Sequence, residues 1–311
     1  MKPAGVRPGR LVLGKRWVNQ FDANPTHATT PYRALCGPTR GTGVADLKKN
    51  LMRYPKPQKG NPHKLTIDQH IFPKACISRF TGANGTVQVR RKCGKKDIWL
   101  TPGNSYFCAR RLWDQKAEAI FMKEIEDRYQ EVAQSIVAGA VTTLDAAMST
   151  AVTDLYLLWS LRHERYLNPL PDIKMNFGAS ECEISVDTQE ILEANGYLFA
   201  APGNIFPSRF MTGLRFVFEM ERERQRMAGK KWGILTSDEA EFLVPDNFSA
   251  SSVLPLSPTI ALVEGHMDQR IGFKQVADIN GQAVHGCCRY FFARDIDRCP
   301  ILKHTILASV F

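Results

Sequence analysis

His70 and Lys74 stand four residues apart in the segment Q-H-I-F-P-K, with Pro73 between them. An imidazole accepts a proton near neutral pH, and an ammonium group stabilises negative charge that develops during phosphoryl transfer. The pair is therefore a candidate general base with a cationic partner. A histidine at this place also suits a second role, in which it hydrogen-bonds a backbone carbonyl and fixes the turn.

The most strongly helical stretch of the chain, from Trp113 to Val137, contains three candidate glutamates: Glu118, Glu124 and Glu126. Apolar residues recur between them at helical spacing. Glu118 and Glu126 are two turns apart, so both can project into one site. Carboxylates near a histidine bind Mg²⁺ or divide acid and base roles. The alternative is an acidic helix face that is simply solvated.

Two further candidates lie at the ends of apolar runs. Arg162 follows L-Y-L-L-W-S-L, where it either grips a phosphate bidentately or complements the negative end of the helix dipole. Asp238 follows W-G-I-L-T-S in a short turn, where it is either a catalytic acid at a strand end or an ordinary turn residue. With Glu118, Asp238 is our candidate ligand for Mg²⁺.

Several familiar sites are excluded by the absence of their motifs. The chain has no Walker A sequence, no G-x-G-x-x-G, no G-x-S-x-G and no H-E-x-x-H. Its 8 cysteines include no C-x-x-C pair, so a structural zinc site is not expected. No apolar run approaches the roughly 18 residues of a membrane span, and the basic start lacks the apolar core of a secretory signal. We therefore expect a cytoplasmic protein with no membrane partner.

Positive charge is concentrated in the first third of the chain. Residues 1–111 contain 22 Lys and Arg against 4 Asp and Glu, whereas the other 200 residues contain 19 against 27. This asymmetry favours a polyanionic partner, DNA or RNA. Two strand-like runs, T-V-Q-V-R-R and D-I-W-L, are joined by K-C-G-K-K, and this hairpin presents a candidate nucleic-acid-binding set: Arg90, Arg91, Lys92, Lys95 and Lys96.

The order of elements favours an α+β fold in which a helical middle lies between a small N-terminal hairpin and a C-terminal antiparallel β unit. Helices are predicted over 113–137, 144–166, 188–196 and 210–229. W-G-I-L-T-S and E-F-L-V-P are predicted to be strands joined by a tight turn, and T-I-A-L-V-E-G-H and H-G-C-C-R-Y-F-F-A are predicted to be two more. Residues 1–64, rich in Pro, Gly, Lys and Arg, are predicted to form a basic extended arm, and 65–311 a single domain.

Read together, several of these segments resemble a large bacterial family, domain of unknown function 4238. The matching pieces are Q-H-I-F-P-K with I-S-R-F, the acidic helix, the arginine at the end of an apolar helix, T-S-D and P-L-S-P. The resemblance covers about Gln69 to Ala293, and Glu239-Ala240 replaces the family's Asn-Pro. Asn280 and Arg289 fall where the family has a late Asn and a late Arg. The resemblance implies that seven residues form one site: His70, Pro73, Lys74, Glu118, Arg162, Ser237 and Asp238. The family supplies no reaction.

From these features we expect a nucleic-acid-directed phosphodiesterase, a hydrolase of the nuclease kind, such as an effector of bacterial antiviral defence or a toxin. His70 would transfer protons, Lys74 and Arg162 would stabilise phosphate charge, and Glu118 and Asp238 would bind Mg²⁺ or orient His70. Two alternatives stay open. One is a non-enzymatic nucleic-acid-binding or structural protein, and the other is an enzyme acting on a small phosphorylated metabolite.

Overall fold

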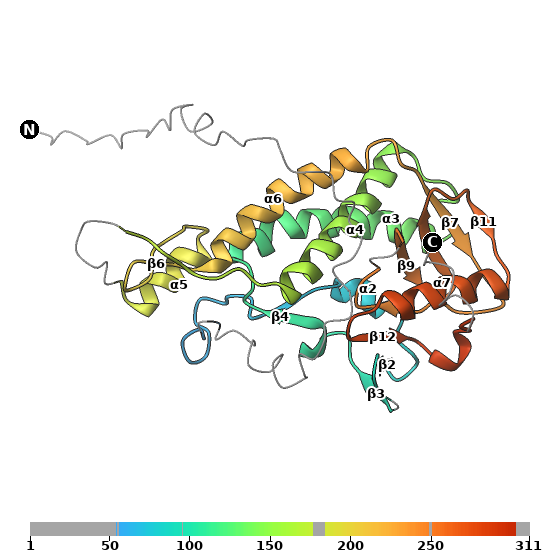
Figure 1. The fold of residues 1–311 in the computed structure, drawn as a ribbon, viewed down its shortest axis with the longest axis horizontal. Helices are drawn as coiled ribbons and strands as arrows, with labels where there is room; N and C mark the ends of the chain where they lie inside the picture. The colour runs from blue at the N-terminus through green and yellow to red at the C-terminus, as the bar shows by residue number, and fades with distance from the viewer. Residues whose placement is uncertain (1–53, 55, 95, 177–183, 249–250, 303–311) are drawn as a thin grey trace, which may run out of the picture. The chain divides into compact units, whose positions relative to one another are not determined.

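A computed structural model describes residues 54, 56–94, 96–176, 184–248 and 251–302. Over these residues the chain is of the α+β class, as the order of sequence patterns predicted (Figure 1). Its strands form two four-stranded sheets and two smaller pairings. The predicted basic arm falls mostly on residues 1–53, which lie outside the described residues.

The first four-stranded sheet joins distant parts of the chain. Its order is β3 (Asp97–Leu100), β2 (Val87–Arg91), β12 (Tyr290–Ala293) and β8 (Val244–Pro245), with every neighbouring pair antiparallel. The predicted β2–β3 hairpin therefore exists, but it belongs to one sheet with the C-terminal strands. On its other side β2 pairs with the apolar strand Y-F-F-A, in a register that places Val89 opposite Phe292.

The second four-stranded sheet has the order β11 (Gln269–Arg270), β7 (Trp232–Thr236), β10 (Ile260–Glu264) and β9 (Val253–Ser257). β10 is antiparallel to β7 and β9, whereas β11 is parallel to β7. β7 does not pair with β8, so the predicted W-G-I-L-T-S and E-F-L-V-P hairpin was wrong. The segment after Asp238 instead crosses to the first sheet, where Val244 and Pro245 contact β12.

Three long helices pack beside each other (Figure 1). α4 (Ala146–Leu167) contacts both α3 (Lys123–Val137) and α6 (Ser208–Arg226). α4 begins at an N-cap, Asp145, whose side chain accepts a hydrogen bond from the backbone N–H of Met148 at 2.7 Å. Its side chains Leu155, Leu158 and Trp159 are fully buried, which places the L-Y-L-L-W-S-L segment in the core. A π-helical segment, η2 (Ala117–Met122), leads into α3.

His70 is placed by a short antiparallel pairing. β1 (Asp68–His70) pairs with β4 (Cys108–Arg110), so that His70 lies opposite Cys108. α2 (Lys74–Ser78) follows directly and buries Cys76 and Ile77, while the 3-10 turn η1 (Ser105–Phe107) precedes β4. Pro73 is the N-cap of α2, since its fixed φ suits a helix start.

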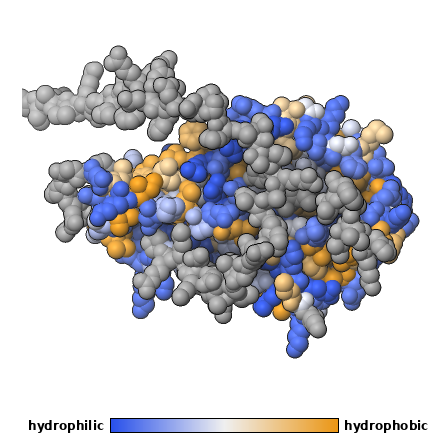
Figure 2. Space-filling view, viewed as in Figure 1, coloured by the Kyte–Doolittle hydropathy of each residue, from blue (hydrophilic) through white to orange (hydrophobic). Residues whose placement is uncertain are grey.

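The remaining elements cover the edges. β5 (Ile173–Lys174) pairs with β6 (Ile205–Phe206), and α5 (Val186–Ala194) lies between them in sequence, followed by Gly196 at φ 75°. α7 (Phe273–Gly286) and the 3-10 turn η3 (Ile296–Arg298) flank β12 in sequence. Figure 2 shows apolar side chains exposed on the surface near β6, α5 and α6, where Tyr197 and Phe218 are well exposed.

The described end of the predicted arm contacts the folded domain. The backbone N–H of Gln58 donates to Glu190 of α5 at 2.6 Å, and the His63 ring lies 2.7 Å from Asp187. Residues 56–64 therefore bind α5, which places them with the domain. Among the described helices, none is both long enough and apolar enough to cross a membrane.

Candidate functional site

The structure gathers His70, Glu118, Glu126 and Arg162 into one cluster, which we call the His70 cluster. Arg162 of α4 bonds Oε1 of Glu126 through Nη1 at 2.6 Å, and its Nη2 lies 3.8 Å from Oε2 of Glu118. His70 is close enough for all three of these charges to act on its imidazole. Four residues between positions 70 and 162 therefore lie within electrostatic range of one another. The sequence analysis expected one site to contain His70, Glu118 and Arg162, and the resemblance did not include Glu126.

Arg162 is the centre of this cluster and is nearly inaccessible. Its side chain is 1% exposed, while the carboxylate-bearing side chains of Glu118 and Glu126 are 21% and 27% exposed. Its guanidinium stacks over the Trp113 ring at 5.3 Å from the centroid. Two of its nitrogens are thus directed at carboxylates, so Arg162 orients Glu118 and Glu126. The sequence had instead predicted that Arg162 would bind a phosphate.

Trp113 also contacts the carboxylate of Glu118. Its indole Nε1 donates a hydrogen bond to Oε2 of Glu118 at 2.5 Å, and its ring is completely buried. Sequence reasoning placed Trp113 only at a helix start and missed this contact. Its aromatic type gave no signal for it, because most tryptophans at such positions simply fill the core.

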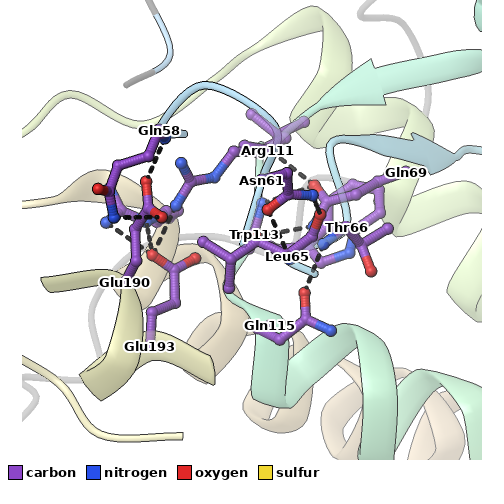
Figure 3. A network of polar contacts seen from close by, with 12 residues as sticks. Gln58, Asn61, Leu65, Thr66, Gln69, Arg111, Trp113, Gln115, Glu190 and Glu193 are labelled. Carbon is purple, nitrogen blue, oxygen red and sulfur yellow. Dashed lines mark hydrogen bonds and ion pairs between the residues drawn. The ribbon is translucent and has the colours of Figure 1, made fainter. Parts of the chain in front are cut away.

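A buried glutamine holds Trp113 in place (Figure 3). The Gln69 side chain donates from Nε2 to the carbonyl of Trp113 at 2.8 Å and accepts at Oε1 from the backbone N–H groups of Leu112 and Trp113, at 2.7 and 3.2 Å. Gln69 is 1% exposed and directly precedes His70. The same side chain therefore ties the β1 strand that carries His70 to the segment that carries Trp113.

The network in Figure 3 continues to α5 through a buried ion-pair set. Arg111 Nη2 lies 2.7 Å from Oε2 of Glu193, and Arg209 Nη2 lies 2.9 Å from the same oxygen. All three side chains are less than a tenth exposed. Arg111 has φ 43°, which is uncommon for a residue with a side chain and is held here by these contacts.

The proton state of His70 follows from its surroundings. Its Nε2 lies 3.0 Å from the carbonyl oxygen of Pro102, and a carbonyl only accepts, so Nε2 carries the proton and Nδ1 carries the lone pair. Burial is the main influence on the imidazole and lowers its pKa below 6.5, against smaller opposing effects of Glu126 and Glu118. His70 is therefore neutral at pH 7 and offers Nδ1 as a base.

Lys74 supplies an exposed cation beside this histidine. A Cβ placed on Gly103 would lie 3.7 Å from Nζ of Lys74, so the ammonium group lies over the Pro102–Gly103 turn that binds His70. The Lys74 side chain is exposed and opens α2. In this arrangement Lys74 can meet a ligand from solvent, which Arg162 cannot.

Asp238 has different neighbours. It forms an ion pair with Arg270 of β11, and both side chains are more than 60% exposed. The next residue, Glu239, accepts a hydrogen bond from the backbone N–H of Phe273 at 2.8 Å and so caps α7. Ser237 is fully buried and its hydroxyl accepts from the N–H of Glu239. In the part of the chain that the structure describes, the contacts of Ser237 and Asp238 lie in this turn and not with the His70 cluster.

The predicted Mg²⁺ ligands are therefore not brought together by these contacts. Glu118 contacts Trp113 and Arg162, whereas Asp238 contacts Arg270. Within the described ranges, no group of three or more His, Cys, Asp or Glu side chains has the arrangement of a metal site.

Two basic residues of the β2–β3 hairpin make hydrogen bonds within the protein. Arg90 forms a two-fold hydrogen-bonded pair with Asp97, at 2.7 and 2.8 Å, and Lys92 donates to the carbonyl of Cys287 at 2.5 Å. Arg91 and Lys96 are exposed and point to solvent. Lys95 lies outside the described residues. Of the described members of the predicted nucleic-acid-binding set, Arg91 and Lys96 are thus exposed without the intramolecular bonds that Arg90 and Lys92 make.

An open groove lies on another part of the surface, where α4 begins and α6 ends. It measures about 980 Å³ and is lined by residues that include Asp154, Arg224, Lys231, Trp232 and His266. Asp154 is buried and takes two hydrogen bonds from Arg224, at 2.6 and 2.9 Å. The principal charges of the groove therefore neutralise each other, and its lining includes no member of the His70 cluster.

No protein-family model matches the chain, and neither the curated proteins nor the solved structures give a significant match. The resemblance to the bacterial family accordingly stays a prediction.

Proposed function

We propose that the protein is a phosphodiesterase that acts on nucleic acid, with His70 as its general base. The observation that carries the proposal is the meeting of His70, Glu118, Glu126 and Arg162, with an exposed Lys74 beside them. A neutral imidazole next to a cation is a common means of activating water against a phosphate ester.

In the proposed reaction, Nδ1 of His70 takes a proton from a water molecule as its oxygen attacks phosphorus. The bond from phosphorus to the leaving oxygen breaks, and that oxygen takes a proton from solvent. Lys74 stabilises the charge on the phosphate oxygens, and Glu118 stabilises the imidazolium that forms. Arg162 and Trp113 are positioning residues, because they hold Glu118 without access to solvent.

The test is incubation of the protein with labelled single-stranded and double-stranded DNA and RNA, with Mg²⁺ or with EDTA. We expect cleavage of at least one of these polymers, and binding that weakens steeply with added salt, as phosphate contacts require. Loss of cleavage in EDTA would add a metal ion to the site. Failure to cleave any polymer under any condition would contradict the proposal, and cleavage of small phosphate esters alone would favour a metabolite as substrate.

A second candidate is a nucleic-acid-binding protein without enzymatic activity. It is favoured by Arg162, which pairs with Glu126 within the fold and does not reach a ligand, while Arg91 and Lys96 stay exposed. In that case the His70 cluster would serve stability, and His70 would fix the turn through the Pro102 carbonyl. Salt-sensitive binding of DNA or RNA without any cleavage would identify this second function.

A further inference from the structure

Arg289 lies in a cage of three tyrosines from three different elements. Its Cζ atom is 4.8 Å from the ring centroid of Tyr166 on α4, 5.8 Å from that of Tyr106 on η1, and 5.9 Å from that of Tyr290 on β12. Nη1 also donates to the Tyr166 hydroxyl at 2.5 Å. The guanidinium is thus fixed in place while remaining half-buried.

No carboxylate neutralises this charge among the described residues. Other buried arginines have one: Arg162 pairs with Glu126, and Arg111 with Glu193. The carboxylate of Asp246 accepts the backbone N–H groups of Cys288 and Arg289, both at 2.8 Å, and lies 3.5 Å from Nε2 of His163, but it makes no ion pair with the Arg289 guanidinium in the described part of the chain. A partly buried, fixed guanidinium without a counter-charge is costly unless an anion binds it.

The free edge of Arg289 has the geometry of an anion site. Within the described part of the chain, Nε and Nη2 make no hydrogen bond, and two parallel N–H groups on one side of a guanidinium match two oxygens of a phosphate. Tyr106 and Tyr166 are half-buried, so their rings can contact whatever group is attached to that phosphate.

The cage adjoins the His70 cluster along two elements. Tyr166 follows Arg162 by four residues on α4, which is one helical turn on the same face. Tyr106 lies in the turn after Pro102 and Gly103, the turn that binds His70. The elements that hold Arg289 are therefore the same ones that carry Arg162 and the turn bound by His70.

We propose that Arg289, held by Tyr166, Tyr106 and Tyr290, is a binding site for a phosphate group. Inorganic phosphate and the phosphate of a nucleotide share this chemistry. Only the choice of a nucleotide as the natural ligand rests on the proposed phosphodiesterase function.

The test is isothermal titration calorimetry of the whole chain with inorganic phosphate, adenosine 5′-monophosphate and adenosine. We expect the wild type to bind the two phosphates and not adenosine. Arg289→Gln should weaken binding by about tenfold to a hundredfold, the value of a charge-assisted contact. The matched control is Arg298→Gln, since Arg298 is an exposed arginine in the same C-terminal segment, and it should bind as the wild type does.

A tighter complex with the nucleotide than with phosphate would identify the tyrosine rings as a second contact, whereas equal affinity would identify free phosphate as the ligand. Because Arg289→Gln removes ring contacts, Tyr166→Phe is a milder second variant that removes only the hydroxyl, and it should weaken binding by about threefold. The proposal is overturned if the wild type binds neither phosphate, or if Arg289→Gln folds and binds as tightly as Arg298→Gln.

The same titrations separate this inference from the proposed function. His70→Ala should abolish cleavage and leave phosphate binding intact. A wild-type protein that binds phosphate through Arg289 but cleaves no polymer would contradict the phosphodiesterase and leave the anion site standing.

Discussion

The indole Nε1 of Trp113 donates a hydrogen bond to Oε2 of Glu118 over 2.5 Å. This contact joins the core to the His70 cluster, because Trp113 is completely buried and its backbone is held by Gln69. Oε2 of Glu118 thereby has two partners, the indole of Trp113 and the guanidinium of Arg162 at 3.8 Å. The position of a candidate functional carboxylate thus depends on residues that never reach solvent.

Trp113→Phe should lower the free energy of unfolding by about 1–3 kcal/mol, since it leaves a cavity at the edge of the ring and removes the donor to Glu118. Chemical denaturation measures the change. The matched control is Trp99→Phe, because Trp99 is 58% exposed on β3 and should shift stability by less than about 0.5 kcal/mol. Equal changes in the free energy of unfolding for the two variants would show that the Trp113–Glu118 contact does not stabilise the fold.

Glu193→Gln should be among the most damaging single substitutions in the protein. It removes the one carboxylate shared by Arg111 and Arg209, and two buried guanidinium groups are left facing a neutral amide. Breaking a buried pair in this way costs about 3–5 kcal/mol. Glu221→Gln, at an exposed position on α6, is the control and should change stability by less than about 0.5 kcal/mol. A melting temperature for Glu193→Gln that equals the control's would contradict the network in Figure 3.

Stability should depend on the pH through His70. Burial lowers the folded-state pKa of His70 below its ordinary value of 6.5. As the pH falls through 6.5, the imidazole of His70 is protonated in the unfolded chain before it is protonated in the native state. The free energy of unfolding therefore decreases until the pH reaches the folded-state pKa of His70, and above pH 7 this decrease is absent. Thermal denaturation between pH 7.5 and pH 5 should show a shallower loss for His70→Gln than for the wild type. Identical slopes would mean that His70 titrates as it does in the unfolded chain.

Thiol reactivity should report the burial of the strand that pairs with His70. Burial raises the pKa of Cys76 to about 11 and that of Cys108 to about 12, whereas Cys93 is exposed. At pH 8, iodoacetamide followed by peptide mass spectrometry should modify Cys93 within minutes and leave Cys76 and Cys108 intact until denaturant is added. Rapid modification of Cys108 in the native protein would show that β1 and β4 open easily.

The sequence predicted most of the long helices because their patterns are local. The periodicity of 144–166 and the acidic helix before Val137 correspond to α4 and to η2 with α3, and Gly196 and Gly229 follow helix ends with positive φ. Helix α7 was missed, since F-K-Q-V-A-D-I-N-G-Q-A-V-H-G contains two glycines and begins without a Ser, Thr or Asp cap. It is instead capped from a distance by Glu239.

Strand partners were harder to predict because pairing is not local. β2 joins β12, about 200 residues away, and nothing in T-V-Q-V-R-R indicates which strand it will meet. The candidate site was equally hard to predict, because its residues are also distant in the sequence. A shared site for His70, Glu118 and Arg162 was expected from residue types and the resemblance and stays a prediction, while Asp238 had the same type of signal and is paired with Arg270. An aspartate in a turn is chemically ambiguous until its neighbours are known.

The central claim is that His70 performs chemistry on a nucleic-acid phosphate. The most direct measurement compares the cleavage rates of wild type, His70→Ala and His266→Ala on the same labelled polymer, with thermal denaturation to show that each variant is folded. His266 is an exposed histidine in the groove near Asp268, so its substitution is a matched control. We predict that His70→Ala loses cleavage by about a hundredfold or more and that His266→Ala cleaves as the wild type does. A folded His70→Ala protein that cleaves at the wild-type rate would contradict the account.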